Sequence, residues 1–346
     1  MMPRVLIVGA GFAGATAARE LAVNGRTVLL TEESGATGGK VRNYGCKATD
    51  KCANCGLCLA NNLWDNVEKN SNIEVRLNTH LVDLYGEKGN YTAALKNNGT
   101  ISYVSEISDV IIAAGFKDTT KTNFNWFLEI ERSCPPGSTS FITGSEIELL
   151  MKKRTETALF EKAPEKIAFI QCFGSRDKKE NAMYCSRVCC AYSTRAAKII
   201  KKYYPHCSIT FFYMEMQQVK SGDYFEELKQ LGMNFVKCRP VKIKDSKPAV
   251  VTFDNPQTGK CEETDFDIVV LANGIRPIDD AAKLAEICGL GQTPAGFLRY
   301  VKGIDHADST GIYVIGCVKG PAKIEEVYTD SIAVARRLIL KESGKT

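Results

Sequence analysis

The sequence predicts an α/β protein built from two domains of parallel sheet, with the second domain inserted into the first. Three apolar stretches that end in small residues, at residues 5–8, 109–116 and 267–277, each indicate a buried strand. Because strand and helix patterns alternate along the chain, helices are expected to cover both sheets. The 346 residues are enough for two such domains, each with its own core.

The order of the expected strands sets the domain boundaries. We place the first domain at residues 1–120 together with residues 280–346, and the second domain at residues 121–279. The strands expected in the second domain are KIAFIQC, SITFFYM, MNFVKC and DIVVLA. Residues 72–99 indicate strands joined by a YGEKGNY hairpin, which is an insert expected in the first domain.

Composition argues against several functions. The net charge is +5 and the basic clusters are small, so no nucleic-acid partner is predicted. The apolar run at the start is broken by glycines and is too short for a secretion signal or a membrane span, so we expect a cytoplasmic protein. In a reducing compartment, fourteen cysteines argue against a disulfide framework and for metal binding or redox chemistry.

The N-terminal stretch RVLIVGAGFAGATAARELAVNG predicts a strand, a tight turn and a helix. Gly9, Gly11 and Gly14 form a G-x-G-x-x-G motif, which lets the backbone approach a pyrophosphate and lets the helix pack on the strand. The free N–H groups at the helix N-terminus would then face the phosphates. The motif predicts a dinucleotide site; the alternative is a glycine turn that binds no ligand.

The second strand, RTVLLTEE, ends in Glu32 and Glu33, and an acid at that place accepts hydrogen bonds from ribose hydroxyls. We prefer Glu32 because it lies directly at the strand end. The GGK segment that follows offers Gly39 and Lys40 as another place where the chain could lie close to a cofactor.

Three later stretches favour FAD over NAD. DVIIAAGF, with Ala114 and Gly115, is a strand that ends in small residues, and DIVVLANGIRP repeats its pattern. The third stretch, TGIYVIGCVKGP, leads through a glycine turn into a long final helix, an arrangement typical of flavoproteins with two dinucleotide-binding domains. In those proteins an Asp after the last Gly binds the ribityl chain. Here Cys317 follows Gly316, so we expect backbone amides of the turn up to Gly320 to replace that carboxylate.

The first cysteine motif, CKATDKCANCGLC, has the spacing C-x5-C-x2-C-x2-C. Its members are Cys46, Cys52, Cys55 and Cys58. Short loops of this kind suit iron–sulfur clusters. Zinc remains open, although structural zinc sites usually use two separated C-x2-C pairs. Redox-active or structural thiols are the third alternative.

The second cysteine motif lies between the strand KIAFIQC and a helix expected over residues 184–203. Its members are Cys172, Cys185, Cys189 and Cys190. Within that helix, positions 185 and 189 would share one face and could reach one ligand. The alternative is that these small apolar side chains fill a core. A second dinucleotide domain would carry its glycine motif here, but only Gly174 remains, so a nicotinamide site is poorly supported. The dispersed residues Cys134, Cys207, Cys238, Cys261 and Cys288 are predicted to be packing residues.

The stretches QCFGSRD…YCSRVCC, GGK…DKCANC and GIYVIGCVKGP resemble the HdrA subunit of heterodisulfide reductase, and more closely its short form in sulfur-oxidising heterodisulfide-reductase-like complexes. The resemblance implies a thioredoxin-reductase-like flavoprotein with two Rossmann-like dinucleotide-binding-type domains, the first split in sequence. It also implies FAD and one or two [4Fe–4S] clusters. The family's cluster ligands fall on Cys172, Cys185, Cys189 and Cys190. The set Cys46, Cys52, Cys55 and Cys58 could hold a second or alternative cluster.

The resemblance further implies an electron-transfer subunit of an oxidoreductase complex that acts on disulfide or persulfide sulfur. The implied partners are the other subunits of that complex, small electron or sulfur carrier proteins, and a second copy of the chain. Electron-bifurcating relatives have Lys at the position that matches Arg195. A fixed Arg cation near the flavin would stabilise its anionic reduced form, so we expect electron relay without bifurcation.

Other functions remain as alternatives. A stand-alone NAD(P)H-dependent disulfide oxidoreductase would need a nicotinamide motif and a C-x2-C pair in the second domain, and residues 121–279 contain neither. An electron-bifurcating subunit of a heterodisulfide reductase and a non-catalytic module with structural cofactors are the others.

Overall fold

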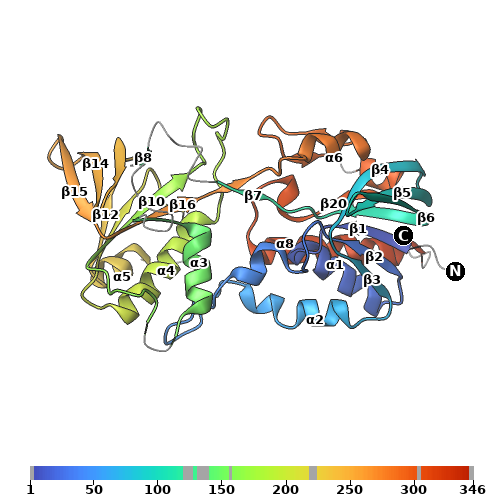
Figure 1. Cartoon of the computed structure of the whole chain (residues 1–346), viewed down its shortest axis with the longest axis horizontal. Coiled ribbons are helices and arrows are strands. Elements are labelled where there is room, and N and C mark those ends of the chain that lie inside the picture. Colours follow the sequence, from blue (N-terminus) through green and yellow to red (C-terminus); the bar gives the residue numbers. More distant parts are fainter. Residues whose placement is uncertain are drawn as a thin grey trace. The chain divides into compact units, whose positions relative to one another are not determined.

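The computed structural model describes residues 4–119, 128–130, 140–155, 158–217, 224–301 and 305–342. The chain divides into two compact units (Figure 1). The first unit consists of residues 1–42, 56–117 and 276–346, and the second consists of residues 43–55 and 118–275. The chain crosses between them within β7 (Lys117–Asp118) and β17 (Ile275–Arg276), which pair as a two-stranded sheet.

The first unit is built on a seven-stranded sheet. Its strands are β1 (Arg4–Val8), β2 (Val28–Thr31), β3 (Ile73–Arg76), β4 (Thr79–Glu87), β5 (Asn90–Asn97), β6 (Thr100–Ile112) and β20 (Ile312–Val314). The order is β3-β2-β1-β6, and β6 also pairs in parallel with β20. The hairpin of β4 and β5 joins the first half of β6 in antiparallel pairing, which confirms the hairpin predicted over residues 72–99.

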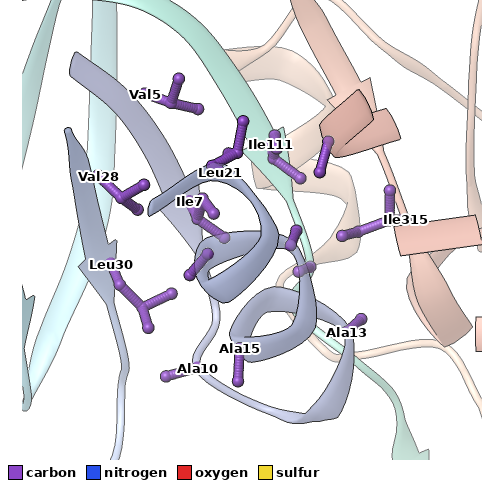
Figure 2. Packing of buried hydrophobic residues seen from close by; sticks show 14 of the residues in the cluster. Val5, Ile7, Ala10, Ala13, Ala15, Leu21, Val28, Leu30, Ile111 and Ile315 are labelled. Atoms are coloured by element: carbon purple, nitrogen blue, oxygen red, sulfur yellow. The ribbon is translucent and has the colours of Figure 1, made fainter. Parts of the chain in front are cut away.

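Helices cover both faces of this sheet. They are α1 (Phe12–Val23), α2 (Leu63–Glu68), α6 (Ala281–Ile287), α7 (Asp305–Thr310) and α8 (Ile324–Glu342), with the short pair β18 (Gly291–Gln292) and β19 (Leu298–Arg299). Figure 2 shows Ile7 of β1 and Leu30 of β2 packed beside Ala15 and Leu21 of α1. The small side chains on α1 let the helix approach the sheet closely, so the motif turn is held at the end of β1.

The second unit has a five-stranded parallel sheet with the order β12-β11-β10-β16-β9. The strands are β9 (Phe141–Thr143), β10 (Lys166–Phe173), β11 (Ser208–Phe212), β12 (Met233–Val236) and β16 (Ile268–Asn273). Its helices are α3 (Gly144–Lys153), α4 (Cys189–Tyr203) and α5 (Tyr224–Gln230). A second sheet combines β8 (Leu128–Ile130), β13 (Lys242–Asp245), β14 (Ala249–Asn255) and β15 (Lys260–Phe266). All four strands predicted for this domain are present.

Two expectations need correction. Helix α4 begins at Cys189 and not at Tyr184, because Arg187 has φ +64° and its N–H bonds to the Cys185 sulfur, which excludes a regular helix there. Residues 43–55, which we expected in the first domain, group with the second unit. Contacts to α3 and the residue after it account for this, since Arg154 donates to the Cys46 carbonyl at 2.6 Å. Among the described residues, no helix is long and apolar enough to cross a membrane.

Candidate functional site

The loop between β1 and α1 brings the three motif glycines together. Gly9 has φ +105°, and a Cβ there would lie 2.5 Å from the Ala113 carbonyl oxygen. A Cβ at Gly14 would lie 1.9 Å from the Gly9 oxygen, so both positions require glycine for packing. At Gly11, by contrast, no described atom lies within 4 Å of the Cβ position. The backbone at Gly11 therefore borders open space.

The N-terminus of α1 has the properties of an anion site. Gly11 is the N-cap, and within the described chain no side chain caps the helix. The first amides of a helix carry a partial positive charge and need acceptors that the helix does not supply. A dinucleotide pyrophosphate fits these donors and the open space at Gly11.

Glu32 lies beside this loop, as the sequence predicted. Its carboxylate accepts hydrogen bonds from the Ala10 amide at 2.8 Å and from the Ser34 amide and hydroxyl at 3.0 and 2.7 Å. Glu32 is buried, whereas Glu33 is exposed. Of the two candidate acids, Glu32 is therefore the one positioned to bind a ribose.

The other predicted contacts of the nucleotide lie at the same end of the sheet. A Cβ at Gly39 would lie 3.1 Å from the Gly11 Cα, so the GGK segment packs against the glycine loop. The Lys40 ammonium lies 5.3 Å from the centre of the Phe116 ring. Ala114–Gly115 directly follows the residue that contacts Gly9.

The turn after β20 differs from expectation in part. The Gly316 amide donates to the Asp330 carboxylate of α8 at 3.0 Å, and the Gly320 amide donates to the Cys317 carbonyl at 3.2 Å. These two amides are thus already paired within the chain. Burial raises the pKa of the Cys317 thiol to about 11, and its sulfur lies 3.7 Å from the Ala322 oxygen. The sequence did not predict the role of Asp330, because this residue lies well along the final helix from the turn that it binds.

In the second unit, the end of β10 carries thiols. Cys172 lies in a bulge of the strand with φ +60°, a strained conformation for a residue with a side chain. Cys189 and Cys190, at the start of α4, are buried against Ala272 of β16. Three of the four predicted thiols therefore lie at one edge of the sheet.

The three thiols interact with one another. The Cys189 thiol forms hydrogen bonds with the sulfurs of Cys172 and Cys190, and these bonds raise the Cys189 pKa well above its usual value. The same bonds lower the pKa of Cys172, and that of Cys190 to about 7, against the opposing effect of burial. Two of the three sulfurs thus favour the thiolate form, which is the form that binds metals.

Cys185 lies in the loop before α4 and accepts the Arg187 N–H at 3.3 Å. Among the described residues, no three Cys, His, Asp or Glu side chains are grouped to hold a metal ion. A [4Fe–4S] cluster makes a different demand, because each of its four cysteines binds a separate iron. The donors are chemically suited to such a cluster, and the cluster itself stays a proposal.

The first cysteine motif is held by the second unit. Arg195 of α4 donates to the Asn54 carbonyl at 3.0 Å, and the Asn54 N–H bonds to the Cys52 sulfur at 3.4 Å. Asn54 has φ +47°, so Cys52 and Cys185 are followed by the same kind of N–H···S turn. We predicted that Arg195 tunes a flavin; the contact found is with this turn, and the flavin role stays a prediction.

A buried ion pair, which the sequence did not predict, secures the same segment. The Lys47 ammonium lies 2.6 Å from the Glu148 carboxylate, and both side chains are about nineteen-twentieths buried. Lys47 also donates to the Gly45 carbonyl at 3.0 Å. The boundary between the units falls within the motif, since Cys46, Cys52 and Cys55 belong to the second unit and Cys58 to the first.

Several buried polar atoms around the second motif have no hydrogen-bond partner among the described residues. They belong to Gln171, Ser175, Ser186 and Ser193. All four lie within four residues of a motif cysteine, which is the signal that could have identified them. An unpaired buried polar group is costly and calls for a partner from outside the chain.

The dispersed cysteines meet expectation in part. Cys207 and Cys288 are buried, as packing residues should be, but Cys261 of β15 is exposed because it lies on an outward-facing strand position. Cys238 is half-buried, and Cys134 lies outside the described residues.

The architecture is a thioredoxin-reductase-like α/β flavoprotein fold with two Rossmann-like sheets. Thioredoxin reductase of Lactococcus lactis matches with a TM-score of 0.59 and 16% identity, covering 98% of this chain and 99% of that one. Thioredoxin reductase of T. acidophilum matches with a TM-score of 0.59 and 17% identity, covering 98% of each chain. Residues 3–124 match the family described as pyridine nucleotide-disulphide oxidoreductase.

The sequence is homologous to the HdrA subunits of heterodisulfide reductases. The second iron-sulfur HdrA protein of CoB–CoM heterodisulfide reductase in Methanopyrus kandleri is 26% identical over 421 residues, covering 96% of this chain and 63% of that protein. The HdrA subunit of the H(2):CoB-CoM heterodisulfide,ferredoxin reductase of Methanothermobacter thermautotrophicus is 29% identical over 252 residues, covering 67% of this chain and 36% of that protein. The chain therefore spans less than two thirds of these relatives.

Proposed function

We propose that this chain is the FAD- and [4Fe–4S]-containing electron-transfer subunit of a heterodisulfide-reductase-like complex that acts on disulfide or persulfide sulfur. The observation that carries the proposal is that thiols occupy the end of β10, where a second dinucleotide domain would have its glycine turn. The homology to HdrA covers nearly the whole chain and supports the same interpretation.

Each cofactor would supply one part of the chemistry, because flavin exchanges two electrons and an iron–sulfur cluster exchanges one. The protein binds and orients these groups. The α1 N-terminus and Glu32 would hold the pyrophosphate and a ribose of FAD. The proposed cluster ligands are Cys172, Cys185, Cys189 and Cys190.

The finer assignment is to the short form found in sulfur-oxidising complexes. We place the protein in the cytoplasm, as a homodimer bound to other subunits, with small electron or sulfur carrier proteins as partners. The mild net charge of +5 is compatible with transient protein contacts and gives no reason to add nucleic acid.

One structural finding favours a second candidate, an NAD(P)H-dependent disulfide oxidoreductase. Residues 43–55 bring the C-x2-C pair Cys52 and Cys55 into the second unit, where the sequence predicted no such pair. This function would also need a nicotinamide site, and the turn after β10 keeps only Gly174 of that motif.

Purification without oxygen, followed by counts of FAD, iron and acid-labile sulfide per chain, tests the leading proposal. About four irons and one FAD are expected for one cluster, and about eight irons for two. Iron-free protein that contains FAD would contradict it. Rapid bleaching of the flavin by NADH would favour the second candidate, whereas reduction by a low-potential donor alone would exclude it.

A further inference from the structure

The thiols of the second motif share their edge of the sheet with three buried serines. A Cβ at Gly274, directly after β16, would lie 2.3 Å from the Ser186 hydroxyl and 3.3 Å from that of Ser175. Alternate residues of an extended chain face the same side, so Gly274 and Ala272 face one side of β16. Cys189 and Cys190 pack on Ala272. The hydroxyls and thiols therefore lie on the same face of this strand.

Ser193 reaches the same place from α4. It lies one helical turn after Cys189 and Cys190, is fully buried, and its hydroxyl has no partner among the described residues. Side chains on a helix lean over the preceding turn, so Ser193 covers the two cysteines. Its neighbour Thr194 differs, because that hydroxyl donates to the Cys190 carbonyl at 2.9 Å.

Three fully buried hydroxyls in one place, each without a partner among the described residues, require an explanation. Each such group costs about 1–3 kcal/mol relative to a paired one. Ser175 and Ser186 belong to loop segments and Ser193 to a helix, so no single backbone distortion accounts for all three. The missing partner is an acceptor that binds beside the thiols.

We propose that Ser175, Ser186 and Ser193 donate hydrogen bonds to the sulfur atoms of an iron–sulfur cluster held by the second motif, and thereby raise its reduction potential. This inference rests on the proposed function. Hydrogen bonds to cluster sulfurs stabilise the more negative, reduced state, and they are one of the levers by which proteins set the potential. The serines are positioning residues, because they act on the cluster and touch no substrate.

The test is a dithionite titration of the full-length protein, purified without oxygen and followed by electron paramagnetic resonance. Ser193→Ala should lower the reduced-to-oxidised ratio of the cluster about tenfold at the wild-type midpoint, equivalent to ~59 mV for one electron. Thr194→Val is the matched control, because it removes a buried hydroxyl on the same helix that is bonded to backbone. Ser193→Thr, which keeps the hydroxyl, should restore the potential.

A second measurement applies even if a variant loads less iron. In protein stripped of iron, Ser193→Ala should leave the unfolding temperature unchanged or raise it, because it removes an unpaired group, whereas Thr194→Val should lower it. Equal destabilisation of both would show that Ser193 has a partner within the chain and would overturn the inference. Iron present with an unshifted potential would also overturn it and leave the proposed function standing. Wild-type protein without iron would overturn both.

Discussion

The two units offer the same position to two different chemistries. In the first, β1 lies between two parallel strands and leads directly into α1, so helix amides and glycine backbone meet a ligand. In the second, β10 also lies between two parallel strands, but a loop intervenes before α4 begins at Cys189. That loop contributes side-chain sulfur and hydroxyl groups. The comparison teaches that the sheet determines where a ligand binds, and the connection after the central strand determines which ligand.

The largest expected effect breaks the second of these sites. Cys189→Ala should remove about four irons per chain and leave FAD in place, because Cys189 is in contact with two other motif sulfurs. Iron and flavin assays on anaerobic protein measure this. Cys207→Ala, at a buried cysteine outside the motifs, serves as the control and should keep its iron. Full iron content in Cys189→Ala would contradict the ligand assignment.

The reciprocal change breaks the first site. Gly14→Ala should yield protein that keeps its iron but purifies without FAD, because the new Cβ would lie 1.9 Å from the Gly9 oxygen. The flavin absorbance per chain reports the loss. Gly291→Ala is the matched control, since its Cβ would make only ordinary contacts at 3.6 Å. Joint loss of FAD and iron would show that the two sites are not independent.

A third change tests whether the first cysteine motif depends on the second unit. Glu148→Ala leaves the buried Lys47 ammonium unpaired, which should cost about 3–5 kcal/mol of unfolding free energy. Chemical denaturation measures it. Lys166→Ala breaks the exposed pair with Asp265 and should cost less than about 1 kcal/mol. Equal losses would mean that the buried pair does not anchor residues 43–55.

The smallest effect sharpens the account of the nucleotide site. Glu32→Gln weakens acceptance of ribose hydroxyls, so the affinity of flavin-depleted protein for FAD should fall about tenfold, in line with hydrogen bonds to a charged group. Titration of the flavin fluorescence gives the dissociation constant. Glu33→Gln, at the exposed neighbour, should bind FAD as the wild type does. Equal affinities of both variants would remove Glu32 from the site.

Much of the first site could be predicted from sequence, because its parts are local. The motif glycines and Glu32 belong to one strand–turn–helix–strand unit, where spacing along the chain largely determines spacing in space. The start of α4 could not be predicted, since Cys185 to Val188 has helical spacing but Arg187 adopts a left-handed conformation. Asp330 and Glu148 were missed because each bonds to a segment remote in sequence.

The sequence by itself determined the α/β class, the glycine motif with Glu32, and the presence of two cysteine motifs, because hydrophobic periodicity and short spacings are local properties of a chain. Only the tertiary structure decided that residues 43–55 belong with the second unit and that unpaired serines gather beside Cys189. A buried ion pair and a shared strand face join residues that are distant in sequence. Their energies depend on burial, which no local pattern reports.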